Sequence, residues 1–337
     1  MSKKTVHTLA DIAHLAGVSK STVSRALNDS PLISQETKER IQAIAKEHHF
    51  RINVSARNLR LQQSHIVAFV VPTYYPEFFS AEDLFGLEIL GGISKGLRAL
   101  GYDLLIIHAD PQDTTWAPTY LDSGRVDGFI IMASNRRQEH LKSLVKLDAP
   151  FIAWGVPISK FNYCSVTGDN FMGGKLAAQH LLQTGRQRIA FLGGPRGELT
   201  VQYRFQGFET ALQETGCSVA QNFIAYGDYS HASGFAAMQR LMEQAPNLDA
   251  VFVNSDLMAI GAINAIQNSG KTVPGDVAVI GYDDLSIAAY NNLPLTTIRQ
   301  NISLVGKLLT QNLIQYIQSG TITNVTTPVE LVIRQSA

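Results

Sequence analysis

Apolar and polar residues follow a helical pattern over the first fifty positions of the chain. Between positions 9 and 16, apolar side chains recur every three or four residues, which is the spacing of one face of an amphipathic helix. Thr8 and Asp11 form the capping-box pattern that begins such a helix. Gly17 interrupts the pattern, and Ser19 is suited to cap a second helix. The sequence therefore predicts two short helices joined by a three-residue turn.

The second of these helices has one apolar and one polar face. Val23 and Leu27 share the inner face. The opposite face carries short polar or basic side chains: Lys20, Ser21, Ser24 and Arg25. Two helices joined by a short glycine turn match the helix-turn-helix, whose second helix enters the major groove of DNA. Arg25 is suited to a guanine edge; the alternative is a solvated helical hairpin with an ordinary charged face.

A third helix is predicted from about residue 35 to residue 49, with Ser34 as its cap. Its inner face comprises Ile41, Ile44, Ala45 and His48. The pair His48 and His49 has no HExxH motif or cysteine partner. We therefore expect a cationic or capping role for this pair at the helix end, and no metal site.

The segment that follows, residues 50–63, is basic and contains no acidic residue. A segment this polar cannot bury a core alone, so we expect it to become helical on DNA, with Asn53 as its N-cap. Leu59 lies close to Arg57 and Arg60. A leucine in this position is suited to enter a minor-groove step while the arginines contact phosphates.

From residue 66 onward, continuous apolar runs alternate with helical stretches. The runs span residues 66–71, 103–108, 128–132, 151–154, 188–194, 223–226, 250–256 and 277–284. Buried parallel strands read as continuous apolar runs, and strands separated by helices indicate parallel βαβ units. The predicted fold class is α/β, with an all-α helix-turn-helix head followed by two doubly wound lobes.

Polar and aromatic residues follow several of these runs, at the strand ends where such sheets bind ligands. They are the aromatic cluster Tyr74, Tyr75, Phe78 and Phe79, the pair Ser255 and Asp256, and the group Tyr282, Asp283 and Asp284. Core packing accounts for some of the aromatic residues. Carboxylates accept hydrogen bonds from the hydroxyl groups of a ligand. Arg204 lies early in the helix after residues 188–194, and its guanidinium can donate two hydrogen bonds to the same ligand. We therefore expect a sugar-like or nucleobase-like ligand.

The length of the chain and the distribution of its charges agree with a separate N-terminal DNA-binding domain. The 337 residues, 45% of them apolar, suit two or three globular domains. Net charge is zero, but residues 1–65 hold ten Lys and Arg against five Asp and Glu, whereas the remaining residues hold 18 against 23. A basic head on a mildly acidic body is expected where only the head contacts phosphates.

Other classes of protein fit the sequence less well. Cys164 and Cys217 lack metal-type spacing and are expected to be buried thiols. We see no signal peptide and no apolar run of about 18 residues, so we expect a cytoplasmic protein without a membrane partner. The glycines at 193, 194 and 197 do not have GxGxxG spacing, and no GxSxG, Walker or zinc motif is present. We expect no enzyme activity, cofactor or metal.

Two sets of motifs resemble the lactose/galactose-repressor family of bacterial transcription regulators. TLADIA, AGVS, STVSRALN and SARNL lie within residues 8–60. RVDGFIIM, GDNFMGGKLAAQHLL, RIAFLGGP, YRFQGF, NSDLMAIGAI, DVAVIGYDD, LPLTTIRQ and PVELVIR extend the resemblance over nearly the whole chain. The resemblance implies a periplasmic-binding-protein-like core and a homodimer on double-stranded operator DNA, most simply as a repressor of carbohydrate-utilisation genes that a sugar-like effector switches. The dimer interface would include the helix near residues 84–97.

The resemblance also implies a division of the chain. The headpiece would span residues 1–50, the hinge 51–64 and the effector-binding and dimerisation domain 65–337, with an N-lobe of about 65–160 and 292–320 and a C-lobe of about 161–291 and 321–337. The hinge has Ile52 where the family often has proline. We predict DNA contacts from Thr8, Ser19, Lys20, Ser21, Thr22, Ser24, Arg25, Asn28, Asn53, Ser55, Arg57, Leu59 and Arg60.

The effector site is carried over residue by residue onto matching positions of this chain. We predict effector contacts from Tyr74, Phe78, Phe79, Asp169, Arg204, Tyr229, Ser255, Asp256, Asp283 and Gln300. The chain departs from the family pattern in two places. It has about seven extra residues near 80–86, and it has Ser255 where asparagine is frequent in the family. A nucleobase, nucleoside or phosphorylated effector remains an alternative, as does, from another class, a sugar-binding module or an enzyme without DNA regulation.

Overall fold

The computed structural model describes residues 8–50, 63–73, 83–110 and 112–337. The chain divides into two compact units, Met1–Ser64 and His65–Ala337, which are considered separately below. Among the described residues, no helix combines the length and apolar character needed to cross a lipid bilayer.

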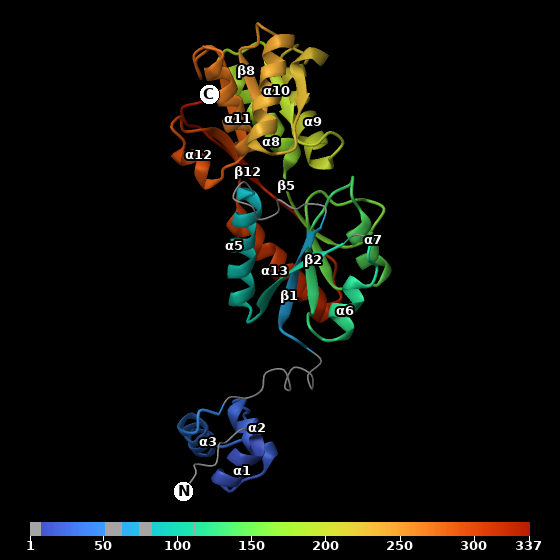
Figure 1. Ribbon diagram of the computed structural model, residues 1–337, viewed down its shortest axis with the longest axis vertical. Helices are drawn as coiled ribbons and strands as arrows, with labels where there is room; N and C mark the ends of the chain where they lie inside the picture. The colour runs from blue at the N-terminus through green and yellow to red at the C-terminus, as the bar shows by residue number, and fades with distance from the viewer. Residues whose placement is uncertain (1–7, 51–62, 74–82, 111) are drawn as a thin grey trace. The chain divides into compact units, whose positions relative to one another are not determined.

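The described part of the first unit consists of three short helices (Figure 1). They are α1 (Leu9–Ala16), α2 (Lys20–Leu27) and α3 (Gln35–Glu47). Their core contains Ile12, Val23, Ala26 and Ile41, each fully buried. The three helices predicted from sequence are confirmed.

Side-chain caps fix where these helices begin, as the sequence pattern predicted. Thr8 and Asp11 form both hydrogen bonds of a capping box at α1, and the hydroxyl of Ser19 accepts the Thr22 N–H at 3.1 Å at α2. The prediction that His48 belongs to the inner face of α3 was wrong. The helix ends at Glu47, and His48 is the C-cap residue, whose side chain is exposed and does not pack on the core.

The second unit contains two six-stranded sheets, one in each lobe. The N-lobe sheet has the order β11-β5-β4-β3-β1-β2, and all its neighbouring strands are parallel. Its strands are β1 (Ile66–Pro72), β2 (Asp103–Ala109), β3 (Gly128–Met132), β4 (Phe151–Trp154), β5 (Cys164–Gly168) and β11 (Asn324–Thr327). Its helices are α5 (Leu84–Ala99), α6 (Trp116–Asp122), α7 (Glu139–Lys146) and α13 (Ile302–Ser319).

The C-lobe sheet has the order β12-β10-β9-β8-β6-β7, and only β12 runs antiparallel to its neighbour. Its strands are β6 (Ile189–Gly193), β7 (Ile224–Tyr226), β8 (Ala250–Val253), β9 (Ala278–Asp283), β10 (Thr296–Gln300) and β12 (Val329–Val332). Its helices are α8 (Asn170–Gln183), α9 (Leu199–Gln213), the 3-10 helix η1 (Gln221–Phe223), α10 (His231–Gln244), α11 (Asp256–Asn268) and α12 (Ser286–Tyr290).

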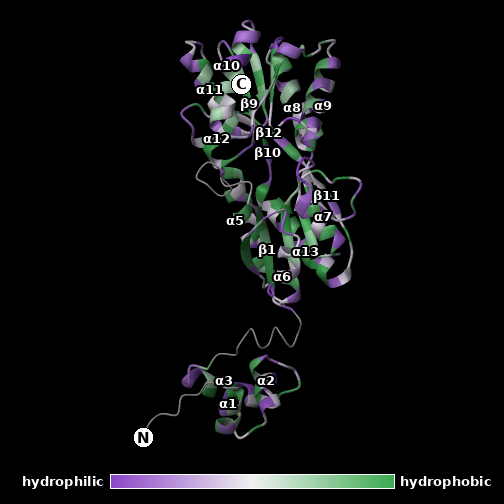
Figure 2. Cartoon of the chain, turned by 45° about the vertical axis from the view of Figure 1, so that its right-hand side comes forward, coloured by the Kyte–Doolittle hydropathy of each residue, from purple (hydrophilic) through white to green (hydrophobic). Residues whose placement is uncertain are grey.

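Helices cover both faces of each sheet, which explains the continuous apolar runs in the sequence. In β1, Val67 and Phe69 pack with α5 and α13, whereas Ala68 and Val70 pack with α6 and α7. Successive strand residues point to opposite faces, so a strand covered on both sides must be apolar at every position. Figure 2 shows apolar residues gathered in the strands and on the inward faces of the helices. The predicted α/β class is confirmed.

The chain crosses between the lobes later than the sequence suggested. The expected crossings lay near Phe161, Asn291 and Gly320. However, β5 and β11 pair with each other in the N-lobe sheet, and β10 pairs with β9 in the C-lobe sheet. The crossings therefore fall near residues 168, 300 and 327, because backbone pairing carries each strand to the end of its sheet before the chain leaves.

Both cysteines are free thiols; Cys164 is buried, whereas Cys217 is only partly so.

Candidate functional site

The outer face of α2 presents the predicted base-contacting residues. Lys20, Ser21 and Arg25 are exposed, and Thr22 and Ser24 are half-buried. The Ser19 hydroxyl lies 2.7 Å from that of Ser21 and 2.8 Å from that of Thr22, which orders the start of the helix.

Two other predicted DNA contacts lie at helix ends. Thr8 caps α1, and Asn28 ends α2, where its side-chain amide donates to the Ser24 carbonyl oxygen at 2.6 Å. The remaining predicted contacts, Asn53, Ser55, Arg57, Leu59 and Arg60, lie outside the described residues.

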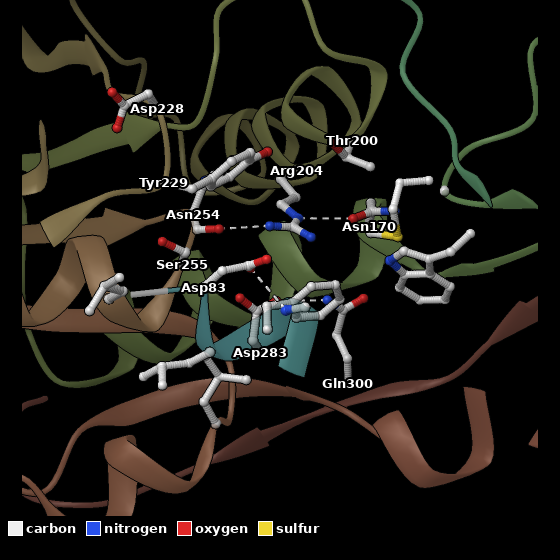
Figure 3. Close-up of a pocket in the computed structure, with 18 of the residues that line it drawn as sticks. Asp83, Asn170, Thr200, Arg204, Asp228, Tyr229, Asn254, Ser255, Asp283 and Gln300 are labelled. Atoms are coloured by element: carbon white, nitrogen blue, oxygen red, sulfur yellow. Dashed lines mark hydrogen bonds between the residues drawn. The ribbon is translucent and has the colours of Figure 1, made fainter. Parts of the chain in front are cut away.

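A cavity of about 320 Å³ lies between the two lobes of the second unit, at the carboxyl ends of the parallel strands (Figure 3). The N-lobe supplies an apolar wall that includes Phe85, Met132 and Trp154. The C-lobe supplies mainly polar side chains, including Asn170, Thr200, Arg204, Asn254, Asp283 and Gln300. This position is where ligands bind in doubly wound sheets.

Arg204 is held in place by three neighbours on the C-lobe side. Its Nε donates to Asn170 Oδ1 and its terminal nitrogen donates to the Asn254 carbonyl oxygen, both at 2.8 Å. Its guanidinium lies 3.5 Å from the ring centroid of Tyr282, a cation–π contact. Burial raises the pKa of Tyr282 to about 12, despite the nearby guanidinium, so the phenol stays neutral.

Close packing of α8 on α9 sets the position of this arginine. A Cβ at Gly174 would meet the carbonyl oxygen of Arg204, and one at Gly207 would meet that of Phe171. Both glycines therefore allow a helix approach that a side chain would prevent.

Asp283 is a buried carboxylate at the end of β9. Gln300 Nε2 donates to its Oδ1 at 2.7 Å (Figure 3). Burial raises the pKa of Asp283 to about 7, although Arg204 and Gln300 act in the opposite direction. Its φ of 111° lies in a region that favours glycine, and strain of this kind is concentrated at functional sites.

The next residue, Asp284, anchors this strained turn. Its two carboxylate oxygens lie 2.6 Å from Arg299 Nε and 2.6 Å from a terminal nitrogen of Arg334. Arg299 also pairs with Glu330 at 2.7 Å. Adjacent aspartates therefore have different partners: Asp284 is neutralised by two arginines from β10 and the C-terminal segment, whereas Asp283 borders the cavity.

The cavity retains unused hydrogen-bonding capacity. Among the described residues, Arg204 and Asp283 form no direct ion pair. Neither side-chain polar atom of the fully buried Asn254 has a hydrogen-bond partner in the described part of the chain, and Gln300 Oε1 also lacks one there. Buried polar groups left unpaired are costly, so these atoms are suited to bind a polar ligand.

An aromatic surface lies opposite these polar groups. The rings of Phe85 and Trp154 are 6.3 Å apart and inclined by 32°. On the C-lobe side Tyr229, with φ of 77°, also lines the cavity, and burial raises the pKa of its phenol. Aromatic faces opposite hydrogen-bonding groups suit a ligand with an apolar face and a polar rim.

The structure brings together five of the residues predicted at the effector site. They are Arg204, Tyr229, Ser255, Asp283 and Gln300. Tyr74, Phe78 and Phe79 lie outside the described residues.

Two predicted effector residues do not line the cavity. Asp169 accepts the Met172 N–H at 2.9 Å as the N-cap of α8. Asp256 is fully buried and accepts from the Thr297 hydroxyl at 2.5 Å and the Leu285 N–H at 2.7 Å. Both carboxylates are engaged within the protein, and effector contacts from Asp169 and Asp256 stay predictions.

Sequence reasoning missed several cavity residues. Asn170 and Asn254 each adjoin a residue that was chosen, and Trp154 ends the recognised run 151–154. The sequence contained a signal for Asn254 and Trp154, because ligands bind at the carboxyl ends of the strands: Asn254 directly follows β8, and Trp154 is the last residue of β4. For Asp83, Thr200 and Asp228, which also line the cavity, we find no such signal.

The fold and the two sites define a protein class in which a helix-turn-helix head for DNA precedes a two-lobed, periplasmic-binding-type domain for a small molecule. Residues 8–53 match the family described as bacterial regulatory proteins, lacI family, and residues 64–335 match the periplasmic binding proteins and sugar binding domain of the LacI family. The chain therefore belongs to the LacI family of bacterial regulatory proteins. The predicted family and the role of ligand-responsive, DNA-binding regulator are confirmed.

Similar proteins span nearly the whole chain. The HTH-type transcriptional regulator CelR of Thermobifida fusca is 33% identical over 99% of this chain and 97% of its own length. The ribose operon repressor of Escherichia coli K12 is 30% identical, with 94% of each chain covered. A CelR–cellobiose complex superposes with a TM-score of 0.75 at 31% identity (98% and 99% covered), and an operator-bound lac repressor dimer with 0.83 at 28% identity (98% of each).

Proposed function

We propose that this protein is a homodimeric repressor that binds operator DNA through α2 and releases or engages it in response to a neutral sugar in the interlobe cavity. The observation that carries the effector assignment is the buried side chain of Asn254 beside Arg204 and Asp283, for which the described part of the chain supplies no hydrogen-bond partner. We infer no catalytic role, and we expect the protein in the cytoplasm because its operator lies there.

The charges at the cavity favour an uncharged ligand. Arg204 is the only basic residue among the described residues that line it, whereas Asp83, Asp228 and Asp283 are acidic. Hydrogen bonds from Ser230 and Ser233 lower the pKa of Asp228 despite its partial burial. A phosphate dianion here would approach more negative than positive charge, whereas sugar hydroxyl groups donate to carboxylates and accept from a guanidinium.

The relatives support a sugar as the ligand class. One solved relative is a complex of CelR with cellobiose, and another relative is named as a ribose operon repressor. Cellobiose and ribose are therefore the first sugars to test. The alternative ligand is a nucleobase, a nucleoside or a phosphorylated molecule, because the cavity combines aromatic faces with hydrogen-bonding groups.

The dimer and its operator rest on a similar argument. The lac repressor structure that resembles this chain is described as a dimer bound to operator. A two-fold dimer would place two α2 helices on successive major-groove faces of a near-palindromic site.

The proposal is tested in two steps with the full chain. Selection from random duplex DNA at fixed salt first defines the preferred operator, and fluorescence anisotropy then compares it with a scrambled duplex. Thermal-shift measurements next screen cellobiose, ribose, other neutral sugars, their phosphates, and the free nucleobases and nucleosides. A ligand at 100 times its Kd raises the stability by about 2.7 kcal/mol.

Each step has an outcome against the proposal. Equal affinity for the selected and the scrambled duplex would overturn the operator assignment. Stabilisation and altered operator affinity with nucleobases, nucleosides or sugar phosphates alone would overturn the neutral-sugar assignment while leaving the DNA-binding regulator assignment intact.

A further inference from the structure

A loop of the N-lobe caps the C-lobe helix that carries Arg204. Asn135, which follows β3, accepts the Leu199 N–H on its Oδ1 at 2.7 Å and donates from Nδ2 to the Gly197 carbonyl oxygen at 2.8 Å. Its neighbour Ser134 donates to Glu198 Oε1 at 2.6 Å. These three hydrogen bonds join residues of different lobes.

The helix has no cap of its own that would replace these bonds. Glu198 occupies the N-cap position of α9, and its side chain makes no capping hydrogen bond. Other helices of the C-lobe are capped from within the lobe, for example α8 by Asp169 and α11 by Ser255. The first N–H groups of a helix need a partner, and for α9 that partner comes from the other lobe.

Two further contacts join the same lobes. The side chain of Leu199 packs against the N-lobe core cluster that contains Ile131 and Phe151. On α5 of the N-lobe, Glu88 Oε1 accepts the Ser286 N–H of the C-lobe at 3.0 Å. The interlobe contact therefore has an apolar as well as a polar part, and more than one location.

The capped helix is also the helix that lines the cavity. Thr200 follows Leu199 directly, and Arg204 lies just over one helical turn further along. Because the cavity is lined from both lobes, an effector makes its full set of contacts only when the lobes are closed. The cap and the effector therefore favour the same arrangement of α9.

We propose that Ser134 and Asn135 are positioning residues that set the equilibrium between closed and open lobes, and thereby the effector sensitivity of this regulator. Neither residue lines the cavity. Loss of the cap lowers the closed population before any ligand binds, and a lower population of the binding-competent state weakens apparent affinity in proportion. The functional consequence rests on the proposed effector role of the cavity, whereas the conformational claim does not.

The size of the effect follows from the number of bonds lost. One neutral hydrogen bond typically changes an equilibrium by a factor of roughly 2 to 12. Asn135→Ala removes two such bonds, so we expect the open-to-closed ratio to rise by roughly 5- to 150-fold. Adding Ser134→Ala removes the third, charge-assisted bond and enlarges the change.

The experiment measures interlobe distance in the full chain without ligand or DNA. Spin labels are placed through Lys142→Cys on α7 and Arg240→Cys on α10, both exposed, with Cys217→Ala removing the partly exposed native thiol. Labelled chains are diluted with unlabelled protein so that one label pair is present per dimer. Double electron–electron resonance then gives the distance distribution for each variant.

A matched control removes another hydrogen bond to the Gly197 carbonyl oxygen, the same acceptor that Asn135 uses. Gln202 donates to the Gly197 carbonyl oxygen at 3.3 Å, but from within the C-lobe. We expect Gln202→Ala to keep the parental distribution, and Ser134→Ala/Asn135→Ala to gain a second population or a displaced mean. If the double variant folds poorly, Asn135→Ala alone, which removes the bonds to Gly197 and Leu199, should shift the distribution in the same direction.

A distribution for the cap variants that superposes on that of Gln202→Ala would overturn the proposal. Because this measurement uses no effector, failure to find a sugar ligand leaves its result valid. Conversely, a sugar that binds and switches the protein while the distances stay unchanged would support the proposed function and refute the cap.

Discussion

Replacing Asp283 by asparagine tests the electrostatic description of the cavity. The pKa of Asp283 is raised by burial from about 3.8 to about 7. A carboxyl group whose folded pKa is raised contributes a stability that is fully present below the unfolded pKa and is lost as pH rises through the folded value. Asparagine keeps the acceptor for Gln300 Nε2 and does not titrate. The unfolding free energy of Asp283→Asn should therefore lack the decrease with pH that the ionisation of Asp283 causes in the wild-type protein.

The magnitude follows from proton linkage. Each pH unit between the two pKa values costs about 1.4 kcal/mol, so between pH 5 and pH 8.5 the wild-type protein should lose about 3 kcal/mol relative to Asp283→Asn. Asp256, whose pKa is also raised by burial and by Asp283, is present in both proteins, so only the part of its titration that depends on Asp283 enters the difference.

Denaturant unfolding followed by tryptophan fluorescence measures this difference. Trp116 and Trp154 are the only tryptophans, and both lie in the second unit, so the signal reports on that unit. As a control, Asp276 is exposed and hydrogen bonds from Thr272 lower its pKa, so Asp276→Asn should give a pH-independent difference over this range. A flat difference for Asp283→Asn as well would refute the description of a buried, destabilised carboxylate.

Four other predictions concern binding and local stability. Arg25→Ala should cost about 1 to 3 kcal/mol of operator binding and relax base preference at one position, measured by anisotropy on single-base operator variants; a uniform loss on all duplexes would contradict it. Arg204→Met should abolish the effector response with operator affinity unchanged. Effector affinity should rise with pH through about 7, where Asp283 ionises, and calorimetry that finds no pH dependence would contradict this. Arg334→Met should destabilise the second unit by about 2 kcal/mol, because it removes one of the two cations paired with Asp284 while Arg299 remains; denaturant unfolding measures the difference.

The helices of the head were predictable because their signals are local. A cap such as Thr8 with Asp11, or Ser19, bonds to backbone only three residues away, so the sequence contains both partners. His48 was misplaced because helical periodicity does not indicate where a helix ends. That depends on the backbone of Glu47 and the residues after it.

The cavity was predictable in outline and less so in detail. The strand-end rule located Asp283 and Ser255, and the family resemblance supported Arg204. The choice between neighbouring residues depends on how a strand twists at its last position, which a linear pattern does not contain. Asn254 therefore faces the cavity, and Asp256 turns into the protein to accept from Thr297 and Leu285.

The lobe crossings and the interlobe cap could not be predicted from local patterns. Strand β5 belongs to the N-lobe because it pairs with β4 and with β11, which lies about 160 residues later in the chain. Asn135 and Leu199 are likewise 64 residues apart and belong to different lobes. Such contacts are properties of the packed chain, so only the structure reveals them.

The two aspartates that end β9 show how stability and binding are reconciled in one short segment. A buried carboxylate in a strained turn is costly, and the protein offsets this cost at Asp284 with two arginines rather than at Asp283. Had Arg204 been used to neutralise Asp283 directly, both groups would be satisfied without a ligand, and a neutral polar molecule would gain little by entering. Because Arg204 instead bonds Asn170 and the Asn254 carbonyl, Asp283 accepts from Gln300 but forms no direct ion pair among the described residues. Under the proposed effector role of the cavity, hydroxyl groups that donate to this carboxylate would supply the differential binding energy that a switch requires.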